Sequence, residues 1–293
     1  MNNTYAISKG KKSLVTFLKR NILFKMIQYS VIAIALVMVI LPLLFLISTS
    51  IKPSLEVYNN VSLIPSRIIW DNFANVLSPE KETVRYLTNS VLITLISTLL
   101  SIFIGSFAAY ALNRLGYTKV AAIITTVIVV VRFYPKITVV LPYFLLMKYV
   151  GMLDKLAGII LSHVSITIPF TVMIMMTFYA EIPKEIEESA FVDGSDVFST
   201  YLRIVIPITT TGMAATAILI SMISWNEFLM ASSIASSEAV TLPILISGFI
   251  TDKGTDWGAM SALSIICMVP IILLVLFTQR YLVRGLTAGA VKG

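Results

Sequence analysis

Six long apolar stretches follow one another along the chain, and shorter polar segments separate them. Each stretch is about 20 residues or longer, the length that an α-helix needs to cross a hydrocarbon core of roughly 30 Å. The pattern therefore predicts an all-α integral membrane protein with six transmembrane helices. The predicted spans are residues 26–50, 87–112, a stretch that begins near residue 119, 156–180, 207–231 and 257–281.

The third span does not read as one continuous helix. Its apolar start is followed by Arg132, Pro135, Lys136 and Pro142. Proline lacks a backbone N–H and clashes with the preceding turn, so it bends or breaks a helix. A broken helix persists at membrane depth only where protein or water satisfies the freed backbone groups. We therefore expect a break here that faces protein or a water-filled cavity.

The polar segments indicate how the chain is oriented. Residues 1–25 are rich in Lys and Arg and hold no acidic residue, and such segments stay on the cytoplasmic side. The first apolar stretch is too long for the core of a cleaved signal peptide, so we expect a retained span. Six spans then return the C-terminus to the cytoplasm. The expected organisation is a tail (1–25), one transmembrane domain (26–282) and a second tail (283–293), in a bacterial plasma membrane.

The composition agrees with a chain embedded in lipid. Of 293 residues, 57% are hydrophobic and 13% are charged, whereas soluble domains carry about 25% charged residues. The net charge of +7 comes from residues that flank the apolar stretches rather than from a basic cluster with interleaved aromatic residues, so we expect no nucleic-acid partner. Cys267 and His163 are each the only residue of their type, so we expect no disulfide framework and no metal site.

One polar segment, residues 181–207, has the pattern of a helix and lies between the fourth and fifth predicted spans, on the cytoplasmic side. Pro183 suits a first helical turn, and Glu185, Glu187 and Glu188 lie near the positive end of the helix dipole. At helical spacing we expect one apolar contact face and an exposed acidic edge. The expected face consists of Ala190, Phe191, Gly194, Val197, Phe198, Tyr201 and Leu202. Interfacial helices usually carry Lys and Arg, so the acidic edge favours a protein partner over lipid.

This segment resembles the EAA signature of importer permeases of the ATP-binding-cassette (ABC) superfamily. That signature is Glu-Ala-Ala, three residues, Gly, nine residues and Ile-x-Leu-Pro, and here Glu188–Ala190, Gly194 and Ile204–Pro207 keep the same spacing. The departures are Ser189 in place of Ala and Ile206 in place of Leu. The resemblance implies a coupling helix that docks into a groove on a cytoplasmic ATPase. The residues assigned to coupling are Glu187, Glu188, Ala190, Asp193, Gly194 and Pro207.

The resemblance extends along nearly the whole chain. The stretches "SWNEFLMA" (Ser224–Ala231) and "QRYLVRGLTAGAVKG" (Gln279–Gly293) look like the maltose-transporter type of sugar permease. This implies a cytoplasmic ABC ATPase dimer, a second permease subunit, and an extracellular or periplasmic solute-binding protein that the loop 232–258 would reach. It also implies a carbohydrate substrate, with a di- or oligosaccharide favoured and a polyol or glycerol phosphate left open. No cofactor is expected in this chain, because ATP and Mg would be used by the partner ATPase.

Polar side chains within the predicted spans are the candidates for the translocation pathway. Charged groups at membrane depth cost about 2.5–3.5 kcal/mol on insertion scales, so they usually face a cavity or a partner. Each of them also has a structural alternative, such as a hydrogen bond between two helices. The candidates are Asn89, Arg132, Tyr134, Lys136, His163, Trp225, Asn226 and Glu227.

Two other classes of protein compete with the importer. An ion-driven secondary transporter would carry acidic relays and inverted repeats within its spans, but Glu227 is almost the only acid there and no repeat is visible. An intramembrane enzyme would need a nucleophile and a base, or a metal pair, and His163 stands alone. The chain has no G-x-x-x-x-G-K-[ST] phosphate loop. We therefore expect no enzymatic activity in this chain.

Overall fold

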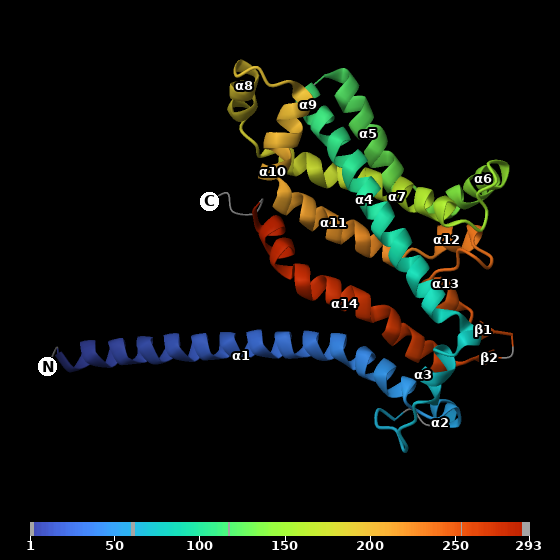
Figure 1. Ribbon diagram of the computed structural model, residues 1–293. Helices are drawn as coiled ribbons and strands as arrows, with labels where there is room; N and C mark the ends of the chain where they lie inside the picture. Colours follow the sequence, from blue (N-terminus) through green and yellow to red (C-terminus); the bar gives the residue numbers. More distant parts are fainter. Residues whose placement is uncertain (1–2, 60–61, 117, 253, 289–293) are drawn as a thin grey trace.

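The protein is almost entirely helical. The computed structural model describes residues 3–59, 62–116, 118–252 and 254–288. Apart from one short antiparallel hairpin, these residues form helices and the turns between them (Figure 1). The elements are α1 (Asn3–Ser50), α2 (Ser54–Asn59), α3 (Asp71–Val76), η1 (Pro79–Lys81), α4 (Thr83–Leu115), α5 (Lys119–Phe133), α6 (Lys136–Tyr149), α7 (Leu156–Ala180), α8 (Lys184–Val192), α9 (Val197–Thr200), η2 (Tyr201–Val205), α10 (Ile206–Ile208), α11 (Thr210–Trp225), α12 (Leu229–Ile234), α13 (Leu242–Ser247), β1 (Ile250–Thr251), β2 (Gly254–Thr255) and α14 (Trp257–Ala288).

The helices that could cross a membrane follow the predicted pattern closely. Helices α1, α4, α7 and α14 are each long and apolar enough to span. Two helix pairs pass the same test only jointly: α5 with α6, bent by 98°, and the segment Val197–Ile208 with α11, bent by 79°. The first bend lies at Tyr134–Pro135, so the predicted break in the third span is confirmed.

The predicted fifth span, residues 207–231, is wrong as a single helix. Pro207 lies in a short helix before a sharp bend, and the long helix α11 ends at Trp225. Asn226 donates its side-chain amide to the Met222 carbonyl (2.8 Å) at this end. The Glu227 carboxylate then accepts hydrogen bonds from the first N–H groups of α12. These two polar residues satisfy backbone groups that helix ends leave unpaired, so they stop one helix and start the next.

The central packing contact joins α4 to α7. The side of α4 that faces α7 and α11 carries small residues, which let helices approach closely where lipid supplies no hydrophobic driving force between them. Ser101 Oγ lies 2.6 Å from Thr167 Oγ1, and a Cβ added at Gly105 would lie 2.7 Å from the Cγ2 of Thr171. Beyond its first turn, the buried small residues of α4 are Ser90, Ser97, Thr98, Ser101, Gly105, Ser106 and Ala109.

Helix α1 is the exception to this packing. In Figure 1 it extends away from the other helices over most of its length, and its most apolar stretch is not buried within the chain. Its large apolar side chains from Phe24 to Leu44 are exposed. The basic segment that precedes the predicted span continues the same helix from Asn3.

Hydrogen bonds hold together the loops at the end of the molecule where α4 begins. The Asp154 carboxylate accepts backbone N–H groups of all four residues 236–239, at 2.9–3.1 Å. Partial burial acts to raise the pKa of Asp154, but these donors outweigh it and hold the pKa well below its usual range. Arg85 pairs with Glu238 of the same loop. Residues 236–239 of the predicted external loop are thus held in place by side chains from outside the loop.

We predict that Gly105→Val weakens the contact between α4 and α7. The added methyl groups would overlap Thr171, and overpacking of this kind costs about 1–3 kcal/mol. The purified chain should therefore lose its folded state at a lower temperature in detergent. Phe103→Val is the matched control, because residue 103 is 72% exposed on another side of the same helix. Equal thermal stability of the two variants would contradict the close approach at Gly105.

Candidate functional site

The acidic loop, which we define as residues 181–207, folds as two helices. Helix α8 ends at Val192, and α9 begins at Val197 with Asp196 as its N-cap, whose carboxylate accepts the N–H of Ser199 at 2.9 Å. The prediction of one continuous amphipathic helix with a shared apolar face is therefore wrong. The interruption lies at residues 193–196, between the two short helices.

Gly194 makes this interruption possible. Its φ of +87° lies in the left-handed region that side chains disfavour. The N–H of Ser195 donates to the Ala190 carbonyl (2.9 Å) and that of Gly194 to the Phe191 carbonyl (3.0 Å), which closes α8 with hydrogen bonds typical of a helix C-terminus. No described heavy atom lies within 4 Å of a Cβ built on Gly194. Within the chain this glycine serves a turn.

Glu187 lies inside the protein rather than on the exposed acidic edge. Its side chain is 3% exposed. The carboxylate accepts hydrogen bonds from the Tyr110 hydroxyl (2.8 Å) and from Arg114 Nε (2.7 Å), and a second nitrogen of Arg114 completes a bidentate pair. Both partners come from the last turns of α4. Arg114 and Glu187 are 73 residues apart in the sequence, so no local pattern indicates this pair.

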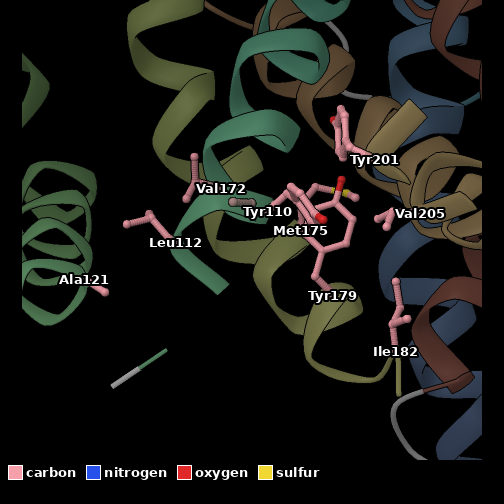
Figure 2. Packing of buried hydrophobic residues seen from close by; sticks show 10 residues of the cluster. Tyr110, Leu112, Ala121, Val172, Met175, Tyr179, Ile182, Tyr201 and Val205 are labelled. Carbon is pink, nitrogen blue, oxygen red and sulfur yellow. The ribbon is translucent and has the colours of Figure 1, made fainter. Parts of the chain in front are cut away.

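A cluster of tyrosines fixes the other half of the loop to the same helix. The Tyr201 hydroxyl lies 2.7 Å from Ser106 Oγ of α4. Its ring lies 4.9 Å from that of Tyr110, and the Tyr110 ring lies 5.8 Å from that of Tyr179 of α7. Figure 2 shows these rings together with Met175, Ile182 and Val205 in one buried cluster. The loop is thus joined to α4 and α7 at two places.

The remaining residues that the EAA resemblance assigned to coupling lie mostly on the surface. Glu188, Asp193, Gly194 and Pro207 are exposed, whereas Ala190 is buried. Large apolar side chains are exposed beside them, and Val192 at the end of α8 is 87% exposed. The surface of the loop therefore combines acidic and apolar groups around the turn at Gly194.

Three of the predicted pathway residues line one cavity. Arg132, Tyr134 and Lys136 meet at the break between α5 and α6, beside a cavity of about 430 Å³ that residues of α7 and Met230 also line. The Arg132 guanidinium lies over the Phe170 ring of α7, 5.1 Å from its centroid.

Two other predicted residues form a buried polar group close to this cavity. His163 Nδ1 lies 2.8 Å from Ser224 Oγ, and its Nε2 lies 3.6 Å from a Glu227 oxygen. Ser224 Oγ is also 2.9 Å from Ser97 Oγ, so the group links α7, α11 and α4. Glu227 accepts the N–H of Met230, which lines the cavity. The alternative interpretation, that His163 forms a hydrogen bond to a neighbouring helix, is confirmed by its contact with Ser224.

The last three predicted pathway residues lie elsewhere. Asn89 donates to the carbonyls of Glu238 and Val240 (2.9 and 3.0 Å). Trp225 is buried and its indole N–H donates to the Cys267 carbonyl (3.2 Å), and Asn226 is exposed at the end of α11. The structure does not bring these three side chains into the cavity at Arg132.

Known structures share this fold. A bacterial ABC transporter involved in the import of the acidic polysaccharide alginate is similar with a TM-score of 0.75 at 19% identity, over 88% of this chain and 96% of that chain. A bacterial alginate ABC transporter in complex with an alginate pentasaccharide-bound periplasmic protein is similar with a TM-score of 0.66 at 16% identity, over 89% and 93% of the two chains. At these identities the similarity shows the fold alone.

The sequence itself matches more specifically. The trehalose transport system permease protein of Mycobacterium tuberculosis is 33% identical over 257 residues, which are 87% of this chain and 93% of that protein. Residues 83–288 match the family described as the inner membrane component of binding-protein-dependent transport systems. Because that match covers most of the chain and contains the acidic loop, the cavity and the buried polar group, this protein belongs to that family of transport permeases.

Proposed function

We propose that this chain is a permease subunit of an ABC importer for a carbohydrate and forms half of the translocation pathway. The family match and the named substrate of the trehalose relative support this proposal. In this proposal the chain crosses the membrane six times, through α1, α4, the bent pair of α5 and α6, α7, α11 and α14. The length and apolar composition of these helices support up to six spans. The acidic loop and both termini lie in the cytoplasm, in agreement with the basic segment at residues 1–25. The terminal residues 289–293 of the predicted C-terminal tail lie outside the described residues.

The observation that carries the proposal is how the acidic loop joins the spans. Its exposed surface around Gly194 and Val192 suits docking onto a cytoplasmic ATPase dimer, which binds and hydrolyses ATP with Mg. The Arg114–Glu187 pair fastens α8 to α4, whose small residues pack against α7 and α11. A displacement of α8 by ATP-driven closure of the ATPase dimer would therefore move these spans together. In this mechanism Glu188, Asp193, Gly194 and Pro207 face the ATPase, while Glu187 and Ala190 hold the loop in shape.

The opposite end of the molecule is assigned to a solute-binding protein outside the membrane. The structural neighbour in complex with a substrate-bound periplasmic protein supports this partner. Asp154 and Arg85 hold residues 236–239 of the loop 232–258 in place, so this part of the loop offers a preformed surface. The exposed apolar side chains of α1 and the cavity at the break between α5 and α6 offer contacts for a second, different permease subunit, which would complete the pathway.

This proposal is tested by using mass spectrometry to identify the proteins that co-purify with the chain. We expect gentle extraction from the native membrane to recover an ABC ATPase and a second permease, and not only lipid. If the chain repeatedly emerges alone in several detergents, the acidic loop has no ATPase partner. An ion-driven secondary transporter would then be the better account.

We predict that Arg114→Met frees the acidic loop from α4. Removing one partner leaves the buried Glu187 carboxylate uncompensated, at a cost of about 2 kcal/mol, less than for fully buried pairs because the guanidinium keeps some contact with solvent. Limited chymotrypsin digestion of the purified protein should then cut the loop about 30-fold faster, because cleavage follows the population of the open form.

Two variants control this experiment. Arg203→Met removes an exposed arginine of the same loop, for which the described residues supply no ion pair, and should leave the cleavage rate unchanged. The double variant Arg114→Met/Glu187→Met replaces both charges by apolar groups and should recover most of the protection. Unchanged cleavage in Arg114→Met would show that the pair does not hold the loop.

A further inference from the structure

The cavity at the break between α5 and α6 is unusual in its charge. Arg132 and Lys136 both line it, and no acidic side chain does. In the described part of the chain, neither cation lies within ion-pair distance of a carboxylate. Glu227 lies close by, but its oxygens accept the N–H groups of Met230 and Ala231 and face His163.

In the proposed topology these cations lie at a depth where an unpaired charge is costly. Helix α5 begins at Lys119, at the cytoplasmic surface in this topology. Arg132 lies roughly 20 Å further along the helix axis, inside a core that is roughly 30 Å thick. Ionisable residues at such depth usually mark the path of a substrate or ion. The Phe170 ring covers one face of the Arg132 guanidinium, which leaves its N–H edges for a further partner.

The backbone adds to the positive potential. Lys136 is the first residue of α6, and Lys136, Val139 and Tyr143 of this helix all line the cavity. The first N–H groups of a helix have no partner within the helix, and its N-terminus carries a partial positive charge. Pro135 precedes the helix, so a break that the sequence imposes brings this end to the cavity.

The rest of the lining suits a sugar ring. Tyr134 and Tyr143 supply aromatic faces, and the Tyr143 hydroxyl is held by the Gly158 carbonyl at 3.1 Å. The volume of about 430 Å³ lies within the range of small-molecule sites.

We propose that this cavity is a subsite for the anionic group of an acidic carbohydrate. Arg132 and Lys136 bind the carboxylate, phosphate or sulfonate of the sugar, and Tyr134 packs against its ring. This inference rests on the proposed function and narrows it, because a neutral sugar would leave both cations without a partner. The phosphate of a lipid headgroup has the same chemistry, so the experiment must separate the two sources.

Binding to the complex extracted from its native membrane tests the subsite. The probes are two matched pairs, glucuronate with glucose and trehalose 6-phosphate with trehalose, measured by equilibrium dialysis. In at least one pair, we expect the anionic sugar to bind about tenfold more tightly than the neutral sugar. This is the effect of one charge-assisted hydrogen bond. Arg132→Gln and Lys136→Gln should each abolish this preference, while Arg132→Lys should keep part of it.

Lys148→Gln is the matched control, because Lys148 lies on α6 but does not line the cavity. Two results would overturn the subsite. In the first, the anionic and the neutral sugar of each pair bind equally or not at all. In the second, the preference for the anionic sugar persists in both glutamine variants. Native mass spectrometry follows bound phospholipid in the same samples. Loss of phospholipid in the glutamine variants with unchanged sugar binding would assign the cations to lipid. If any of these negative results is obtained and an ATPase still co-purifies with the chain, the subsite is overturned but the importer proposal is not.

Discussion

The buried carboxylate of Glu187 is the constraint on which the arrangement of the acidic loop depends. A carboxylate this far from water requires a cation and hydrogen bonds, since an unpaired buried charge is strongly destabilising. Arg114 and Tyr110 supply them from one end of α4. The loop therefore keeps one position relative to α4, and the tyrosine cluster repeats this attachment at Tyr201. A displacement of the loop would therefore act on α4, which lies at the centre of the bundle.

Polar groups inside the bundle divide into two kinds. Ser224 hydrogen-bonds both Ser97 and His163 and so links three helices. Such bonds join helices where lipid offers no hydrophobic driving force. Arg132 and Lys136 instead face a cavity at a broken helix and have no carboxylate partner among the described residues. The first kind contributes to the packing of the bundle, and the second lies where we propose that a solute meets this subunit.

Much of the fold follows from the sequence because lipid restricts the choices. The uninterrupted apolar stretch 156–180 is helix α7, and Pro135 between two cations marks the observed break. The end of α11 was missed because Asn226 and Glu227 are only two polar residues within a long apolar stretch, and hydropathy averages them away.

The site was harder to predict than the spans. Gly194 was assigned to a contact face because helical periodicity alone does not distinguish a glycine in a contact from one in a turn. The pair between Arg114 and Glu187 joins residues far apart in the sequence, and no local pattern indicates such a partner. The roles of the exposed loop residues in coupling stay predictions, since they concern contacts with another protein.

The most direct test of the central claim is solute uptake by proteoliposomes that contain the purified complex and its binding protein. The account predicts that a radiolabelled carbohydrate accumulates only when ATP is present on the side of the acidic loop. It also predicts that uptake does not respond to a proton or sodium gradient. Accumulation driven by such a gradient without ATP would contradict it.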